Sequence, residues 1–247
     1  MYLKWNSKTI TDFDEKNTES LYNLGFVFTR EKKGAMSQTR SVRVDLNKFE
    51  LSSENKRILR KNEGVELKQH ALPYSDYHWT IGKTAKDFYE QKFGKNIFSA
   101  NKIKELLTEQ EKSNFNLLLE FCHSEAKDDL SLRAQRSNLS SPTKIASSAI
   151  PPRNDTATIG YAICFQTKNI LHYSYPFYNL SATNDLPNIG IGMMTKAMIL
   201  AKASDKDHIY LGSAKDTASL YKFQFKGVEW FDGKNWSENI EDLKNTF

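Results

Sequence analysis

Four cations that fall within six positions are the residues of this chain best suited to bind an acidic partner. They are Lys56, Arg57, Arg60 and Lys61, near the end of the segment "RSVRVDLNKFELSSENKRILRKN", residues 40–62. On a helix, positions 56 and 60 and positions 57 and 61 lie one turn apart, where like charges repel by roughly 0.2–0.5 kcal/mol per pair. An anion bound against the helix relieves that repulsion, so the stretch predicts contact with phosphates or another acidic partner. The alternative is a solvated helix face.

The elements that position these cations are predicted from the hydrophobic pattern. Residues 18–24 are typical of a short amphipathic helix that Gly25 closes, and a strand is expected over 26–29. The run "SVRVDL" alternates apolar and polar residues, which predicts a strand with one buried face. Ser52 or Ser53 can then cap the helix that carries the four cations.

The overall composition is that of a globular protein with a mild positive charge. The 247 residues include 35 Lys plus Arg and 30 Asp plus Glu, so a basic excess is informative only where it is local. The 39% hydrophobic content suffices for one large domain or two small ones. We find no signal peptide and no run of eighteen apolar residues, and we therefore expect a cytoplasmic protein with no membrane partner. The two cysteines, Cys122 and Cys164, predict buried thiols and no structural metal.

The middle of the chain changes character abruptly. Residues 84–93 and 99–121 are expected to be helical in part, and "NFNLLLEF" within them is apolar enough for a buried strand. From about 127 to 158 the chain is rich in Ser, Asn and Pro and has no clear period, which predicts a flexible insertion. The wording "LRAQRSNLSSPTKIASSAIPPRND" resembles the translated palindromic mobile elements that interrupt genes in some intracellular bacteria. An ordinary linker is the alternative.

The order of elements after the insertion is typical of an acyltransferase. Two strands, "IGYAICFQ" and "ILHYSYPFY", precede a helix expected over 189–203 and a further strand, "HIYLGS". In the Gcn5-related acetyltransferase architecture two adjacent strands separate, and the helix presents its N-terminus to the acyl donor. Gly190 and Gly192 allow close backbone approach at that end. They are equally compatible with a helix start that binds no ligand.

Both ends of the chain resemble the arginyl- and leucyl-tRNA–protein transferases. In the first half the resemblance rests on "LYNLGFVFTR" and on the basic segment with its Val-Arg-Val strand and Arg-Lys-Asn end. In the second half "YPFYN", "NIGIGMMTKAMI", "IYLGS", "YK" and "FDG" recur in the family's order. The resemblance covers roughly residues 18–68 and 159–236. The chain departs from the family in lacking its cysteine cluster, for which "KKGAMSQT" stands, and in a shorter segment, "SAKDTASL".

The resemblance implies an α+β fold with a mixed sheet in two acyltransferase-like (GNAT-like) halves. These are residues 1–121, with the basic helix, and residues 159–247, separated by the insertion at 122–158. The implied activity is transfer of Arg or Leu from tRNA to the N-terminal α-amine of proteins that begin with an acidic residue, which tags them for degradation by the N-end rule. The ester of the aminoacyl-tRNA is already activated, so the co-substrate is aminoacyl-tRNA and no cofactor is expected.

The resemblance also assigns roles to single residues. Tyr178 and Tyr210 would face the cleft and relay protons or position the terminal adenosine, with core tyrosines as the alternative. Lys222 would pair with the acidic acceptor, with an ordinary surface lysine as the alternative. Gly190 and Gly192 would offer backbone to the donor end. The tRNA-binding residues would be Arg43, Lys56, Arg57, Arg60 and Lys61.

Some residues and some functions stay open at this level. His172 and His78 have the ordinary pKa of a base but match no family motif. Glu229 and Asp232 are expected to orient their neighbours. A CoA-dependent N-acetyltransferase is a rival reading, since it needs the second half but not the basic helix. A degenerate protein that binds tRNA or protein without turnover is the other, because of the missing cysteines.

Overall fold

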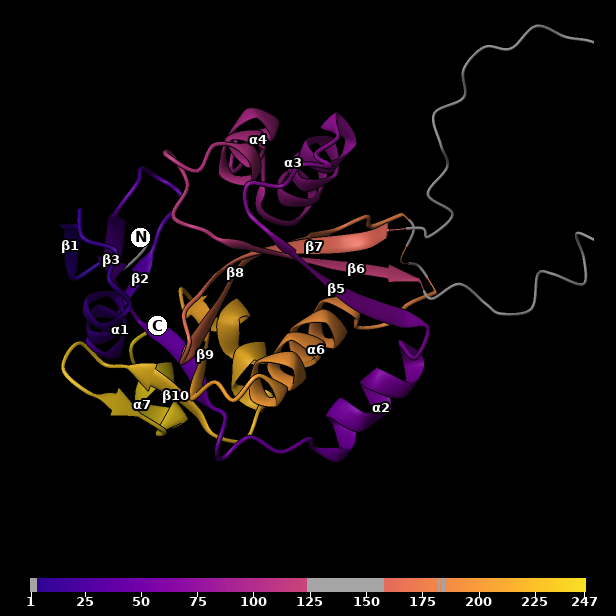
Figure 1. The fold of residues 1–247 in the computed structure, drawn as a ribbon. Coiled ribbons are helices and arrows are strands. Elements are labelled where there is room, and N and C mark those ends of the chain that lie inside the picture. The colour runs from indigo at the N-terminus through magenta and orange to yellow at the C-terminus, as the bar shows by residue number, and fades with distance from the viewer. Residues whose placement is uncertain (1–3, 124–157, 182, 184) are drawn as a thin grey trace, which may run out of the picture.

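The computed structural model describes residues 4–123, 158–181, 183 and 185–247, and most of the predicted insertion lies outside these residues. Their main element is an eight-stranded mixed sheet (Figure 1). Only β8 and β9 are parallel neighbours, and the other neighbours are antiparallel. The strand order is β11 (Trp236–Ser237), β10 (Val228–Phe231), β4 (Ser41–Asp45), β9 (His208–Ser213), β8 (Ile170–Tyr178), β7 (Thr158–Gln166), β6 (Leu117–His123) and β5 (Val65–Ala71).

The sheet joins strands from both ends of the chain. β4, from the basic segment, lies between β9 and β10, which belong to the C-terminal part. The mixed α+β sheet is therefore confirmed, but two separate GNAT-like halves are not seen in the described residues. The pairing of β4 with both C-terminal strands places the two ends of the chain in one sheet. The predicted borders at 122 and 158 also fall within strands, because β6 extends to His123 and β7 begins at Thr158.

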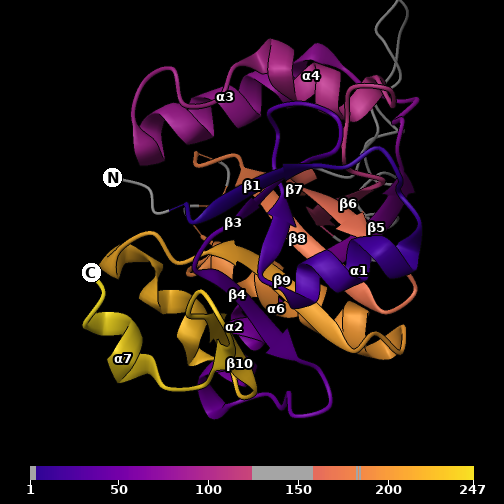
Figure 2. The ribbon, with the colours of Figure 1, turned by 90° about the vertical axis from the view of Figure 1, so that its left-hand side faces the viewer.

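Helices cover both faces of this sheet (Figures 1 and 2). α2 (Ser53–Lys61) and α6 (Ile189–Ala203) lie on one face, over a core that includes Val42, Val44 and Met193. The other face is covered by α1 (Glu15–Asn23), α3 (Trp79–Phe93) and α4 (Ala100–Thr108). Its core includes Tyr22 and Tyr210. Since successive residues of a strand point to opposite faces, neighbours in β4 and β9 contribute to different cores.

Smaller elements complete the described chain. A three-stranded sheet in the order β1 (Asn6–Thr9), β3 (Ala35–Gln38) and β2 (Phe26–Phe28) packs beside α1 (Figure 2). A 3₁₀ helix, η1 (Thr217–Gln224), follows β9, and α7 (Ile240–Lys244) ends the chain. In the part of the chain that is described, no helix is both long enough and apolar enough to cross a bilayer.

The basic helix starts where its sequence predicts. The Ser52 hydroxyl accepts a hydrogen bond from the Asn55 backbone N–H at 3.1 Å, and the Ser52 N–H donates to Asn55 Oδ1 at 3.2 Å. This reciprocal cap satisfies two backbone donors and contributes about 1 kcal/mol. At the other end the Asn62 side chain donates to the carbonyl of Ile58 at 2.8 Å and to that of Pro187 at 3.3 Å. Asn62 therefore links α2 to the loop that leads into α6.

Candidate active site

The parallel strands β8 and β9 pair at three positions and then separate. The last pair is His172 with Tyr210. Beyond it β8 continues to Tyr178 beside β7, while β9 continues to Ser213, which pairs with Ser41 of β4. Each strand keeps its outer neighbour, so a wedge opens between the carboxyl ends of β8 and β9. This is the strand separation that the order of elements predicted.

The helix that follows β8 begins at this wedge. α6 starts after Asn188, which has a φ of 60° and whose side chain makes no capping hydrogen bond. A Cβ atom on Gly190 would lie 3.4 Å from Cε1 of Tyr178 and 3.5 Å from its hydroxyl oxygen. The Tyr178 ring therefore stands against the first turn of α6. Uncapped N–H groups at such a turn favour an anion or a developing oxyanion.

The two glycines of this turn have different surroundings. Gly192 is buried, and a Cβ atom there would lie 3.4 Å from the side-chain amide of Asn62. Its missing side chain allows α6 to pack closely on the end of α2. Gly190 therefore faces the Tyr178 ring, whereas Gly192 serves the contact between two helices.

Lys222 of η1 is buried at the end of β9. Its ammonium donates a hydrogen bond to the Ser213 carbonyl at 2.8 Å and lies 3.9 Å from the place a Cβ atom of Gly212 would occupy. Burial lowers the pKa of this amine to about 8, and Asp216 offsets part of that effect. Lys222 is therefore neither an ordinary surface lysine nor a freely exposed cation. An amine with this pKa can both accept and release a proton near neutral pH.

Two further tyrosines lie close to Tyr178. The Tyr221 side chain in η1 is 46% exposed, and the partial burial of its hydroxyl, followed by the neighbouring Tyr178 hydroxyl, raises the pKa of Tyr221. Burial also raises the pKa of Tyr173 in β8, with smaller contributions from Cys164, Tyr221 and Tyr178 among others. The Tyr173 hydroxyl is buried, and among the described residues it has no hydrogen-bond partner. Such an unpaired group is costly, so it favours any ligand that supplies a partner.

His172 marks the point where the strands part, but its chemistry is not that of a base. Its Nδ1 is 2.9 Å from the Tyr22 hydroxyl. Burial and then the charge of Lys222 lower the pKa of His172 to about 3. It therefore stays neutral at physiological pH and orders the buried aromatic core.

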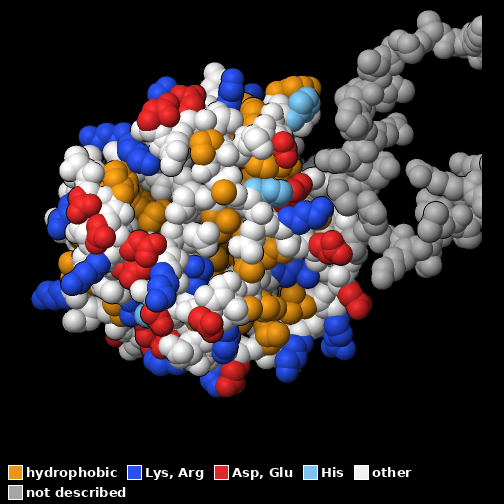
Figure 3. Space-filling model, viewed as in Figure 1, with side chains coloured by type: hydrophobic (Ala, Val, Ile, Leu, Met, Phe, Trp, Pro, Cys, Tyr) orange, Lys and Arg blue, Asp and Glu red, His pale blue; other side chains and the backbone are white. Residues whose placement is uncertain are grey.

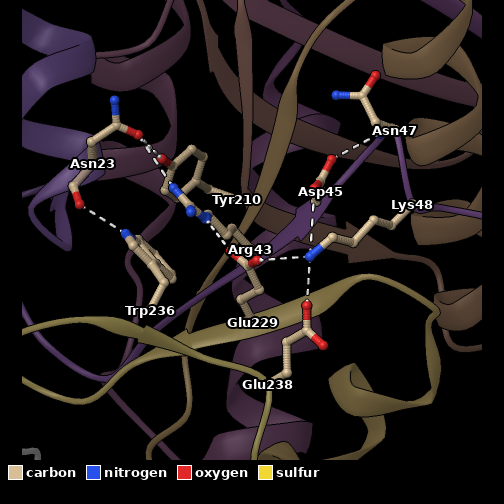
Figure 4. A network of polar contacts seen from close by, with 9 residues as sticks. All are labelled: Asn23, Arg43, Asp45, Asn47, Lys48, Tyr210, Glu229, Trp236 and Glu238. Atoms are coloured by element: carbon tan, nitrogen blue, oxygen red, sulfur yellow. Dashed lines mark hydrogen bonds and ion pairs between the residues drawn. The ribbon is translucent and has the colours of Figure 1, made fainter.

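Tyr210 and Arg43, two predicted site residues, belong to a polar network on the α1 side of the sheet (Figure 4). Arg43 Nε donates to Glu229 at 2.8 Å, and its guanidinium lies 4.0 Å from the ring centroid of Trp236. The Tyr210 hydroxyl is 3.5 Å from Asn23 Oδ1, and burial raises the pKa of Tyr210 to about 12. Tyr210 is a core residue, as the alternative interpretation held, and not a residue of an open cleft.

The same network explains why Arg43 does not join the cations of α2. The Arg43 side chain points away from the face that carries α2, because Val42 and Val44 on either side of it enter the α2–α6 core. Glu229, which pairs with Arg43, also lies 3.7 Å from Lys48, and Lys48 in turn pairs with Glu238 at 2.6 Å. The expectation that Glu229 orients its neighbours fits these contacts.

The cations of α2 lie on the molecular surface, where basic side chains are mixed with acidic ones (Figure 3). Arg57 donates two hydrogen bonds of 2.6 Å to Glu54 one turn earlier. Lys56, Arg60 and Lys61 have no ion-pair partner among the described side chains. Lys56 and Lys61 act only at longer range, among the causes that lower the pKa values of Glu50 and Glu54. The helix thus has three cations outside close ion pairs and one, Arg57, that must leave a carboxylate before it meets a phosphate.

The remaining sequence candidates lie apart from the wedge. His78 is at the start of α3, where its Nδ1 is 3.0 Å from the Thr80 hydroxyl. Asp232 accepts hydrogen bonds from two backbone N–H groups of the turn between β10 and β11, so its role is structural. In the described chain no three His, Cys, Asp or Glu side chains are grouped closely enough to hold a metal ion.

Comparisons with known proteins give structural likenesses only. No protein-family model matches the sequence, and no curated protein matches it. The structure is similar to that of FemX, with a TM-score of 0.47, 11% identity, and coverage of 94% of this chain and 71% of that one. It is also similar to L-PGS from Bacillus licheniformis, with a TM-score of 0.42, 10% identity, and coverage of 81% and 52%.

A third likeness is to a domain of a putative lysylphosphatidylglycerol synthetase from Agrobacterium fabrum, with a TM-score of 0.43, 11% identity, and coverage of 94% and 68%. The chain spans about half the length of L-PGS. At these scores the likenesses do not establish a shared activity. The wedge, the start of α6 and Lys222 are therefore the features on which a function must rest.

Sequence reasoning missed part of this site. It did not single out Tyr173 and Tyr221, although both lie within motifs that it quoted, "ILHYSYPFY" and "YK". Tyr173 and Tyr175 alternate in the sequence, which predicts that they share a face. An irregularity in the β7–β8 pairing instead places Tyr173 in the α2–α6 core and Tyr175 against the opposite core. Nothing in the sequence shows that η1 returns to the end of β9, so the burial of Lys222 was not foreseeable.

Proposed function

We propose that this chain is an aminoacyl-tRNA–protein transferase that moves Arg or Leu from tRNA to the α-amine of a protein with an acidic N-terminus. The observation that carries the proposal is Lys222, a buried amine. It lies beside the wedge between β8 and β9, where α6 begins. The motifs at both ends of the chain, which resemble those of the arginyl- and leucyl-tRNA–protein transferases, support aminoacyl-tRNA as the donor and an acidic N-terminus as the acceptor. The three cations of α2 outside close ion pairs are suited to tRNA phosphates.

The reaction balances without a cofactor. The acceptor nitrogen attacks the ester carbonyl carbon, a C–N bond forms, and the C–O bond to the terminal ribose breaks. The attacking nitrogen must lose a proton, and the departing ribose oxygen must gain one. The resemblance implied that Lys222 pairs with the acidic side chain of the acceptor; its burial and lowered pKa favour a role as the base instead. In this proposal the neutral amine of Lys222 accepts the first proton, and its ammonium returns a proton to the ribose oxygen.

When the acceptor attacks, negative charge develops on the carbonyl oxygen of the ester. Hydrogen-bond donors must already be in place to stabilise it. The Ile189 N–H at the start of α6 already donates to the Leu186 carbonyl at 3.2 Å. The N–H groups of the next residues are suited to the ester oxygen, because the turn has no side-chain cap and Gly190 leaves room beside Tyr178. The unpaired hydroxyl of Tyr173 offers one further hydrogen bond to a ligand in the wedge. Tyr178 then positions the donor end by contact with its ring.

The decisive experiment follows transfer of labelled Arg or Leu from charged tRNA to peptides that begin with Asp, Glu or Ala. We expect product with Asp and Glu, little with Ala, and loss of product in Lys222→Arg, which keeps the charge but cannot deprotonate. Lys215→Arg is the matched control, because Lys215 is exposed on the same segment. No transfer from either tRNA, or full activity in Lys222→Arg, would refute the proposal.

The pH profile separates Lys222 from the acceptor, whose α-amine also titrates near pH 8. Aminooxysuccinate is a suitable acceptor, because it keeps the acidic side chain of Asp and its nucleophilic nitrogen is uncharged well below that pH; the rate without enzyme is subtracted. With it, the wild-type rate should still rise toward pH 8 as Lys222 loses its proton. Transfer from acetyl-CoA with no binding of tRNA would instead favour the N-acetyltransferase, and tRNA binding without turnover would favour a binding protein.

A further inference from the structure

A groove separate from the wedge lies between α3 and α4. It encloses about 460 Å³, and the side chains that line it include Tyr77, Trp79, Lys83, Lys86, Asp87 and Lys104. The two helices lie side by side on the face of the sheet opposite α2 and α6 (Figures 1 and 2). The groove is therefore distinct from both the predicted tRNA helix and the candidate active site.

The base of the groove depends on a glycine. A Cβ atom on Gly82 of α3 would lie 2.6 Å from the Tyr77 hydroxyl and 3.2 Å from the Ala100 carbonyl oxygen. With any other residue at this position the Tyr77 hydroxyl would have to move. The glycine lets the start of α4 and the Tyr77 ring approach α3 while the outer surfaces of the helices remain apart.

Trp79 is the large apolar side chain of this groove that is exposed to solvent. It is the first residue of α3 and is 62% exposed, whereas Trp230 is 4% exposed and sits in the core. A flat indole exposed to this degree lacks the stabilisation that burial of its surface provides. A planar ligand stacked on the ring would supply it.

The charges around Trp79 favour a ligand that is also anionic. Three lysines line the groove and only one acid, Asp87, does so. Lys83 pairs with Asp87 at 2.5 Å and Lys86 with Glu90 at 3.7 Å, and these are exposed surface pairs one turn apart. Exposed pairs of this kind contribute little, so a phosphate can replace the carboxylate.

Lys104 is more readily available than either of those lysines. It lies on α4 and has no ion-pair partner among the described side chains. The whole stretch over residues 79–108 holds six lysines and three acids, so the groove lies within a basic region. On the α3 wall Lys83 follows Trp79 by one helical turn, about 5.4 Å along the axis, so a phosphate next to a stacked base meets a cation.

We propose that this groove binds single-stranded nucleic acid, with one base stacked on Trp79 and the adjoining phosphates on Lys83, Lys86 and Lys104. A flat exposed aromatic ring flanked by cations is how proteins hold unpaired bases without reading their sequence. The proposal does not depend on the transferase activity, since none of its residues lines the wedge.

The test is binding of a fluorescein-labelled oligouridylate of about twelve nucleotides to the full chain at about 50 mM salt. Trp79→Ala should weaken binding about tenfold. Phe93→Ala is the matched control, because Phe93 is 63% exposed on the same helix but does not line the groove. Its affinity should equal that of the wild type.

Two charge-reversal variants test the phosphate contacts. Lys104→Glu should weaken binding and lower the slope of log affinity against log salt by about one, whereas Lys92→Glu, on the exposed end of α3 outside the groove, should change both less. All four positions are exposed, and circular dichroism checks that each variant is folded.

Several outcomes would overturn the proposal. They are no binding at low salt, equal losses in Trp79→Ala and Phe93→Ala, and equal affinity for a duplex of the same length. Equal affinity for adenosine monophosphate would also overturn it, since the groove would then be a site for a free nucleotide. None of these results bears on transfer from aminoacyl-tRNA, so failure here and failure of the transferase proposal are distinguishable.

Discussion

Replacing Lys222 by Met should stabilise the protein at neutral pH while it abolishes transfer. Burial of the amine lowers its pKa from the ordinary value of 10.5 to about 8. Below pH 8 the lysine is charged in both the folded and unfolded states, and the folded state bears the cost of the buried charge. The difference in pKa corresponds to about 3 kcal/mol.

The observed gain should be smaller than that figure. Met fills a similar volume without the charge, but it loses the hydrogen bond that the ammonium donates to the Ser213 carbonyl at 2.8 Å. A hydrogen bond from a charged donor contributes about 1.5–3 kcal/mol. The net stabilisation in Lys222→Met at pH 7 is therefore expected to be about 0–1.5 kcal/mol, from the opposition of these two effects.

The pH dependence makes the reasoning testable. The folded state releases its proton from Lys222 near pH 8 and the unfolded state only near 10.5, so wild-type stability gains from this group as pH rises between those values. Lys222→Met has no such group. Its advantage over the wild type should fall from pH 7 to pH 10 and change sign, because the hydrogen bond of the neutral amine remains.

Urea unfolding of the wild type, Lys222→Met and Lys215→Met at pH 7, 8.5 and 10 measures this difference. Other groups titrate alike in all three proteins, so they cancel. Lys215→Met should show no trend, because Lys215 is exposed. A constant difference between Lys222→Met and the wild type across this range would refute the assignment of a buried, easily deprotonated amine.

Three further predictions follow from the described contacts. Arg60→Glu should weaken tRNA binding and flatten its salt dependence more than Arg57→Glu does, because Arg57 already pairs with a carboxylate. Equal affinities of both variants and the wild type in a filter-binding assay would show that α2 is only a solvated helix face. Arg43→Ala should cost about 3 kcal/mol in urea unfolding, because it leaves Glu229, whose side chain is 12% exposed, without its closest partner, and a cost below about 0.5 kcal/mol would contradict that account. Replacement of residues 128–157 by a short Gly-Ser linker should leave the melting temperature and any transfer unchanged. A large drop in either would show that the segment belongs to the fold.

Local patterns in the sequence predicted most of the elements near the site. The helix over 189–203 and the strand "HIYLGS" have the predicted bounds, and Ser52 caps the basic helix. Asp232 and Gly233 form the turn of the β10–β11 hairpin. Each of these depends on neighbours within a few residues, such as a cap, an alternation or a turn. The strand β5 was missed, since its sequence "VELKQHA" is largely polar and lies at the edge of the sheet.

The sequence by itself determined the secondary structure around the wedge, the mild charge and the basic helix, because these follow from residue type and spacing. Only the tertiary structure decided which side chains meet. β4 pairs between β9 and β10, which turns Arg43 into the partner of Glu229 and Tyr210 into a core residue. η1 returns to the end of β9 and buries Lys222, and that burial lowers the pKa of its amine. Desolvation depends on everything that surrounds a group, from all parts of the chain, and no local pattern encodes it.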